Sequence, residues 1–314
     1  MRASKLILAL LALASLAAPV APPPAQALEL AAGVPPVAWL VGRVAGPEAT
    51  VQILSGPGQN PHTFEPTPKQ VAGLSRAAAY FSVGLPFEEK VLAKLKAANP
   101  GLRVVDLTAG LDLLPEPAEP GHGHGPGKAA KGHGHAKPQA GGHAHDEGEM
   151  DPHVWLSPRL CQAMARAVAT GLSELDPARA PAYAANLAGL LADLQGVDAR
   201  LGGLLAPLKG QEFLVYHPAF GYFGRDYGLR QVAVETGGRE PGPKRLAGLI
   251  ARAKARKIKV IFVQPQFPQK TAEQVAREIG GAVAALDDLA ADPLANWERM
   301  AQALTQGLAG AGRP

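Results

Sequence analysis

The chain has 314 residues, of which 47% are hydrophobic and 18% are charged. Because a single domain usually has ~100–200 residues, this length favours two compact units, and the composition excludes a chain that is disordered throughout. The formal net charge is +4, the cations are scattered, and aromatic residues make up only 5% of the chain. We therefore expect no nucleic-acid partner. A single cysteine, Cys161, excludes an internal disulfide and metal sites built on several thiolates.

The first 27 residues have the pattern of an export signal. Two cations precede the apolar stretch 6–16, and the small residues at 25 and 27 form a signal-peptidase pattern. The apolar stretch is shorter than the ~20 residues that a membrane span needs. An uncleaved anchor is the alternative, but the prolines at 22–24 would interrupt a continuing helix. We expect cleavage after Ala27 and a soluble periplasmic protein.

From residue 28 onward, short apolar runs alternate with helical stretches in two groups. The first group predicts strands at 51–54, 79–83 and 103–106, with helices near 67–77 and 86–98. The second predicts strands at 212–216, 231–235, 260–263 and 282–286, with helices near 218–227, 242–257, 269–280 and 293–309. This alternation is typical of parallel sheets. We expect an α/β protein with two similar lobes, each a mainly parallel sheet flanked by helices, over residues 28–177 and 209–314.

Between the two groups, all signals are helical. Ser157-Pro158 and Asp176-Pro177 are each typical of a helix start. Apolar residues then recur at helical spacing over residues 178–208, which predicts one long helix. At ~1.5 Å per residue, such a helix reaches roughly 35–40 Å, enough to join the lobes as one rigid strut. A core helix belonging to one lobe is the alternative.

Residues 115–150 differ from the rest of the chain. Glycine and proline occur throughout them and no apolar periodicity is present, so we expect a mobile loop. The stretch carries six of the nine histidines: His122, His124, His133, His135, His143 and His145. Their His-x-His pairs suit borderline divalent metals, but an unconstrained backbone predicts weak binding.

The remaining histidines, His62, His153 and His217, each lie beside a proline and shortly before a helix start. A neighbouring proline restricts the backbone and lowers the entropic cost of aiming a ligand. His217 also follows the strand predicted at 212–216, and ligands of open α/β sheets bind at the carboxyl ends of strands. Three imidazoles without a thiolate suit Zn²⁺.

A carboxylate or a water could complete the coordination. Asp287 is the preferred candidate because it follows the strand predicted at 282–286, and Asp288 is its rival. Glu65, three residues after His62, could accept an imidazole N–H or could be a solvated loop acid. The sequence has no H-E-x-x-H helix, no G-x-S-x-G elbow and no phosphate loop, so we expect no enzyme.

Four motifs in this order resemble one known family. They are NPHTFEP at 60–66, DPHVWLSP at 151–158, YHPAFGYFGRDYGL at 216–229 and VIFVQPQF at 260–267. With a histidine-rich insertion before the second motif, the chain is similar over about residues 33–310 to the zinc-specific solute-binding proteins of ABC transporters, the metal-binding cluster A-I group. The resemblance implies two α/β lobes bridged by one rigid helix, with the metal between the lobes.

The resemblance also implies a ligand set. His62, His153 and His217 match the three histidine ligands of zinc-binding members, and Asp287 matches a carboxylate that ligates in some members. Manganese-binding relatives generally have a glutamate at the third position, so His217 favours zinc. The chain departs from several relatives at Gln264, where they have a glutamate.

The function that the resemblance implies is capture of Zn²⁺ in the periplasm and delivery to an ABC-transporter permease, by a protein that we expect to be a monomer. The alternatives are a manganese-binding or broader divalent-metal member of the same family, a zinc storage protein or adhesin, and a zinc hydrolase that uses the same three histidines.

Overall fold

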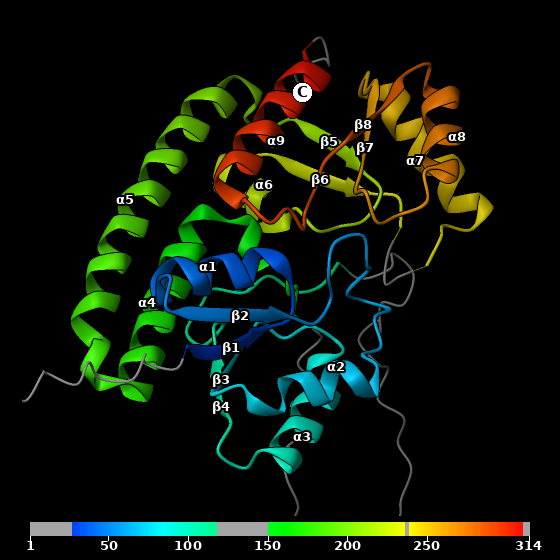
Figure 1. Ribbon diagram of the computed structural model, residues 1–314. Coiled ribbons are helices and arrows are strands. Elements are labelled where there is room, and N and C mark those ends of the chain that lie inside the picture. The colour runs from blue at the N-terminus through cyan, green and yellow to red at the C-terminus, as the bar shows by residue number, and fades with distance from the viewer. Residues whose placement is uncertain (1–26, 118–149, 236–238, 310–314) are drawn as a thin grey trace, which may run out of the picture.

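The computed structural model describes residues 27–117, 150–235 and 239–309. The export signal expected over residues 1–27 and the loop expected over 115–150 therefore lie almost wholly outside the described residues. The described chain forms two α/β lobes, and one long helix runs along both of them (Figure 1). The expected fold class is confirmed.

The N-terminal lobe is built on a parallel four-stranded sheet of order β2-β1-β3-β4. Its strands are β1 (Leu28–Ala32), β2 (Ala49–Ile53), β3 (Ala79–Ser82) and β4 (Arg103–Asp106). Its helices are α1 (Pro35–Ala45), α2 (Pro68–Gly73), the 3₁₀ turn η1 (Leu74–Arg76) and α3 (Glu88–Ala98). The sequence pattern predicts neither β1 nor α1, although β1 is an inner strand. A proline pair opens α1, and proline is tolerated in the first turn of a helix although it usually indicates a break.

The C-terminal lobe repeats this topology, with a parallel sheet of order β6-β5-β7-β8. Its strands are β5 (Glu212–Val215), β6 (Arg230–Ala233), β7 (Val260–Val263) and β8 (Ala282–Ala285). Its helices are α6 (Gly221–Tyr227), α7 (Pro243–Ala255), α8 (Lys270–Ile279) and α9 (Pro293–Leu308). In both lobes the first strand lies between the second and the third, so the two sheets have the same topology.

Two helices separate the lobes in the sequence. A 3₁₀ turn, η2 (Val154–Leu156), leads into α4 (Pro158–Leu175), whose N-cap hydroxyl on Ser157 accepts the backbone N–H of Leu160 at 3.0 Å. The long helix α5 (Ala180–Leu205) is flanked by the 3₁₀ turns η3 (Pro177–Arg179) and η4 (Ala206–Leu208), which makes residues 177–208 continuously helical. At ~1.5 Å per residue, the 26 residues of α5 span roughly 39 Å.

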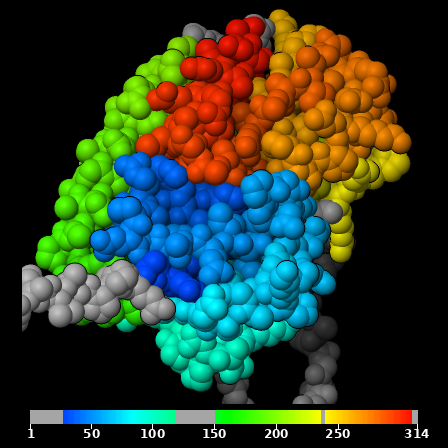
Figure 2. Space-filling view, viewed as in Figure 1, coloured from blue at the N-terminus to red at the C-terminus, as the bar shows by residue number. Residues whose placement is uncertain are grey.

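Helix α5 contacts both lobes. It packs against α1 and α4 on one side of the molecule and against α9 of the C-terminal lobe, and its surface runs beside both the blue and the red parts of the chain in Figure 2. Leu190, Leu194, Val197 and Leu201 are fully buried along one face, at the spacing of a helix that covers a core. These contacts favour a strut between lobes over a core helix of one lobe.

The C-terminal sheet has a different cluster of buried hydrophobic residues on each of its faces. Phe213 and Val215 of β5 belong to the large cluster that continues through the N-terminal lobe, whereas Leu214 and Tyr216 belong to a smaller cluster under α7 and α8. Side chains alternate between the faces of a strand, so one face of this sheet packs on the rest of the molecule. In the part of the chain that is described, no helix is both long and apolar enough to cross a membrane.

Candidate metal centre

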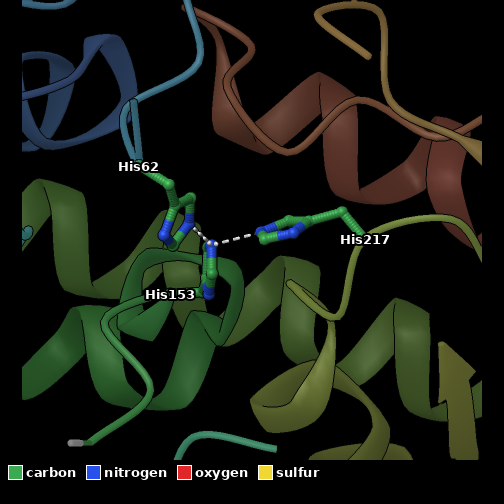
Figure 3. Close-up of side chains that lie close together, drawn as sticks. All are labelled: His62, His153 and His217. Carbon is green, nitrogen blue, oxygen red and sulfur yellow. Dashed lines mark hydrogen bonds between the residues drawn. The ribbon is translucent and has the colours of Figure 1, made fainter. Parts of the chain in front are cut away.

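Three imidazole rings converge where the two lobes meet. His62 lies on the loop after β2, His153 at the turn that precedes α4, and His217 directly after β5 and Tyr216. One ligand atom from each histidine lies within 4.8 Å of the other two. The Nε2 atom of His153 lies 3.1 Å from Nε2 of His62 and 3.3 Å from Nε2 of His217 (Figure 3). Three nitrogen donors from distant parts of the sequence thus face one point.

The same kind of turn positions the rings of His62 and His153. The Oδ1 atom of Asn60 accepts the backbone N–H of His62 at 2.9 Å, and Oδ1 of Asp151 accepts the backbone N–H of His153 at 3.0 Å. Both bonds reach two residues along the chain across a proline, which is the turn that Asn and Asp side chains favour. The Asn-Pro-His and Asp-Pro-His motifs are therefore rigid turns that aim a ring.

Two glutamine side chains hold the loop that carries the third ring. The buried amide of Gln264 donates to the carbonyl of His217 at 2.9 Å and accepts its N–H at 3.4 Å. The amide of Gln231 accepts the N–H of Phe220 at 2.9 Å and donates to the carbonyl of Pro218 at 3.3 Å. A neutral amide suits this position because it can donate and accept at once.

Two of the rings have a carboxylate behind them. Nδ1 of His153 lies 2.6 Å from Oδ1 of Asp151, and Nδ1 of His217 lies 2.7 Å from Oε2 of Glu235. When Nδ1 donates its hydrogen to a carboxylate, the lone pair remains on Nε2, which is the atom that faces the cluster in both residues. Such pairs fix the tautomer and the orientation of metal-binding histidines and raise their basicity.

The pairing of these two carboxylates with the histidines was not predicted from the sequence. For Glu235 a signal was present, because β6 pairs with β5 and the N–H of Glu235 donates to the carbonyl of Tyr216 at 2.9 Å. Residues that follow neighbouring parallel strands lie at the same edge of the sheet, so Glu235 falls beside His217. For Asp151, the signal in the sequence was its position two residues before His153, from which its carboxylate can reach the ring of that histidine.

His62 differs from the other two histidines of the cluster. Its side chain is half-buried, whereas His153 and His217 are each 4% exposed. Within the described residues, no carboxylate hydrogen bond to His62 is found. Glu65, which we considered as its partner, is exposed and lines with His62 a cavity of about 310 Å³. A second cavity, of about 530 Å³, also reaches His62, so solvent approaches the cluster from this side.

The protonation of the rings follows from these surroundings. Burial, with the neighbouring rings of His153 and His217, lowers the pKa of His62 to about 2. Burial also lowers the pKa of His153, but the carboxylates of Asp151, Asp288 and Glu116, with Asp151 the first among them, together offset it, so that the net pKa of His153 lies above its ordinary value. A proton therefore competes with a metal mainly at His153 rather than at His62.

The two candidate carboxylates have different environments. Oδ1 of Asp287 accepts the backbone N–H of Leu289 at 2.8 Å, and Asp287 is not in the group of converging ligand atoms. Asp288 is buried, accepts a hydrogen bond from Gln266 at 2.8 Å, and has its pKa raised by burial against the opposing effect of the charges on His217 and His153. Among the described residues that group contains three histidines and no acid, so ligation by Asp287 stays a prediction.

Aromatic rings shield the buried side of the cluster. The ring of Phe267 stacks on His217 with centroids 4.7 Å apart and planes 22° apart, and Trp155 lies edge-on to His153 at 5.3 Å. The indole N–H of Trp155 donates to the carbonyl of Asp288 at 2.7 Å. Apolar walls of this kind lower the local polarity and strengthen interactions with a bound cation.

The fold and the cluster together define a class of protein, the two-lobed α/β binding proteins that hold a metal between their lobes. The chain matches, over residues 31–311, the model of the family described as ZnuA, zinc-uptake complex component A, periplasmic, and it belongs to that family. This is a family of transport components and not an enzyme family.

Similar proteins carry related names. AdcA, a zinc-binding lipoprotein of Streptococcus pneumoniae, is 31% identical over 250 residues, which are 78% of this chain and 46% of AdcA. ZnuA, a high-affinity zinc uptake system protein of Bacillus subtilis, is 31% identical over 247 residues, 76% of this chain and 71% of that protein. The crystal structure of a ZnuA deletion mutant with zinc bound superposes with a TM-score of 0.78 at 35% identity, covering 92% of this chain and all of the other. The chain spans about half the length of its AdcA relatives.

Proposed function

We propose that this protein captures Zn²⁺ between its lobes and delivers it to the permease of an ABC transporter. The observation that carries the proposal is the convergence of three imidazole nitrogens, from both lobes, within 4.8 Å of one another. Membership of the zinc-uptake family supports the same function. A metal held between two lobes can be released by a limited movement of one lobe, as a carrier requires.

The donor set favours zinc among divalent ions. Imidazole is a borderline donor that prefers Zn²⁺ to the harder Mn²⁺, and three neutral rings offer no negative charge to attract Mg²⁺ or Ca²⁺. The carboxylates behind His153 and His217 each lie within hydrogen-bond distance of Nδ1, which leaves Nε2 of both rings to face the metal. Cu²⁺ and Ni²⁺ bind such donors well by the Irving–Williams order, so in the cell metal availability contributes to selectivity.

We assign the ligands as His62, His153 and His217, with Asp287 or a water in the fourth position. Three converging nitrogens and one further donor make the tetrahedral geometry of zinc. Asp287 and Asp288 follow β8 as His217 follows β5, which places both acids at the edge of the sheet that bears the site. Asp288 is the rival ligand because its charge interacts with two of the rings.

The proposal includes a location, a monomeric state and the absence of catalysis. The cationic and apolar pattern of the first 27 residues supports export to the periplasm with cleavage after Ala27. One chain supplies all three histidines, so a monomer is sufficient for binding. The cluster has no assigned general base beside an open coordination position, so we propose a carrier rather than a hydrolase.

Titration of the purified, metal-free protein with Zn²⁺ against a chromophoric chelator tests the function. We expect one tight site per chain, lost when His153 or His217 is replaced by alanine, and impaired growth of cells that lack the protein under zinc limitation. Tight Mn²⁺ binding with weak Zn²⁺ binding would favour the manganese alternative, most of the metal in weak sites would favour storage, and ester or peptide hydrolysis by the zinc form would favour an enzyme.

A further inference from the structure

A tyrosine of the C-terminal lobe reaches into the N-terminal lobe behind the metal site. The side chain of Tyr222, in α6, is fully buried. Its hydroxyl donates to the carbonyl of Asp151 at 2.7 Å and accepts the backbone N–H of Leu114 at 3.1 Å. Leu114 and Asp151 are themselves paired, because the N–H of Asp151 donates to the carbonyl of Leu114 at 2.8 Å. One hydroxyl thus joins two segments of the other lobe.

Asp151, to which Tyr222 donates, is the residue that orients the proposed ligand His153. A single oxygen of Asp151 contacts both the backbone N–H and the Nδ1 atom of His153, at 3.0 and 2.6 Å. A displacement of the Asp151 backbone would therefore move the carboxylate and the ring together. The start of α6 is also close, since a Cβ built on Gly221 would lie 3.0 Å from Oδ2 of Asp151. A side chain at this position would therefore press on the carboxylate, which glycine avoids.

Other contacts hold Tyr222 in place. The guanidinium of Arg225 lies 5.1 Å from the centre of the Tyr222 ring and donates to the carbonyl of Asp112 at 2.8 Å. Burial raises the pKa of Tyr222 to about 12, so the hydroxyl keeps its hydrogen and can donate to Asp151. Helix α6 therefore presents a fixed donor to the N-terminal lobe.

We propose that Tyr222 is a positioning residue for the metal site, which acts from the C-terminal lobe through Asp151 on the ring of His153. This inference rests on the proposed function and deepens it. The N-terminal lobe supplies His153 and its carboxylate, but the contact that fixes this pair comes from the other lobe. The metal therefore gains its full set of aligned ligands only when α6 is docked on the N-terminal lobe, and separation of the lobes would weaken His153 as a ligand in addition to removing His217.

The variant Tyr222→Phe tests this role in the full chain, with Tyr227→Phe as the matched control. Tyr227 lies in the same helix, and its hydroxyl donates to Asp198 at 2.9 Å rather than to the site. We expect the Zn²⁺ affinity of Tyr222→Phe, measured by chelator competition, to fall about ten-fold, and that of Tyr227→Phe to change less than about two-fold. The visible absorption of the Co²⁺-loaded protein should change in Tyr222→Phe alone.

A double-mutant cycle with Asp151→Asn separates positioning from general destabilisation. If Tyr222 acts through Asp151, the loss caused by Tyr222→Phe should be much smaller when Asp151 is already replaced. Independent, multiplying losses would overturn the proposal, as would an unchanged affinity of Tyr222→Phe or an equal loss in Tyr227→Phe. If the unsubstituted protein binds no Zn²⁺, the proposed function fails. If it binds Zn²⁺ and Tyr222→Phe binds equally well, only the inference fails.

Discussion

The two sides of the histidine cluster are built differently. On the buried side, His153 and His217 each pair with a carboxylate and are each 4% exposed. On the open side, His62 is half-buried, lies on a loop, and borders two cavities. This asymmetry agrees with the proposed carrier, in which we expect the ring of His62 to leave the metal before the other two rings.

The largest expected effect comes from removing the fixed ligands. We expect His153→Ala and His217→Ala each to lower the Zn²⁺ affinity by more than about 100-fold, beyond the 10–100-fold that the loss of a carboxylate behind a ligand typically costs. His62→Ala should also abolish tight binding. For the more conservative His62→Gln, measured by stopped-flow mixing, we expect the dissociation rate of Zn²⁺ to rise by a larger factor than the association rate falls. If the glutamine variants of all three histidines change the association and dissociation rates of Zn²⁺ equally, the distinction between the two sides is removed.

The second-largest loss of Zn²⁺ affinity should come from neutralising the carboxylates behind His153 and His217. Asp151→Asn and Glu235→Gln keep the shape of each side chain but remove its charge, and we expect each to lower the Zn²⁺ affinity by roughly 10–100-fold. Glu65→Gln is the matched control on the open side, and its affinity should change less than about two-fold, because Glu65 is exposed and has no hydrogen bond to His62 in the described chain. A large effect of Glu65→Gln would show that the open side has a carboxylate partner as well.

The pH dependence of binding should reflect His153 before His62. Because the folded-state pKa of His153 is raised, this ring takes up a proton before His62 does as the pH falls, and the Zn²⁺ affinity should decrease as the pH drops through that raised pKa. The pKa of His62 is lowered to about 2, so its protonation should contribute nothing at mildly acidic pH. In Asp151→Asn the decrease should move to lower pH. A constant affinity between pH 5 and 7 would contradict neutral imidazoles as ligands.

The smallest expected effect concerns the fourth position. Asp287 is engaged by the N–H of Leu289, so Asp287→Asn should lower the Zn²⁺ affinity by less than about ten-fold, well below the effect of losing a histidine. Asp288→Asn is the paired variant. If Asp288→Asn has the larger effect in competition titrations, the rival carboxylate rather than Asp287 is the ligand.

Sequence patterns predicted most of the fold because both lobes follow simple periodicities. The strands at 79–83, 103–106 and 260–263 and the helix over 178–208 were found within a few residues of their bounds. Strand β1 and helix α1 were missed. The LELAA segment of β1 has one acid between two leucines, followed by two alanines. It becomes an inner strand through its pairing with β2 and β3, which no local pattern expresses.

The histidines of the candidate site could be predicted because each lies beside a proline in the sequence. The prolines next to His62, His153 and His217 marked all three rings. Glu235 lies beside His217 because β5 and β6 are paired, and Asp151 lies beside His153 because of a turn. The contact of Tyr222 with Asp151 forms only when the two lobes pack together. Such contacts join residues 71 positions apart in the chain, as between Tyr222 and Asp151, so only the folded arrangement reveals them.

The most direct test of the account is a crystal structure of the metal-bound protein with anomalous scattering measured at the zinc edge. We predict a single strong zinc peak bonded to the Nε2 atoms of His62, His153 and His217, with Asp151 and Glu235 on the opposite nitrogens of the last two. A tight zinc ion bonded elsewhere, or one held by fewer than two of these three rings, would contradict the assignment of the site.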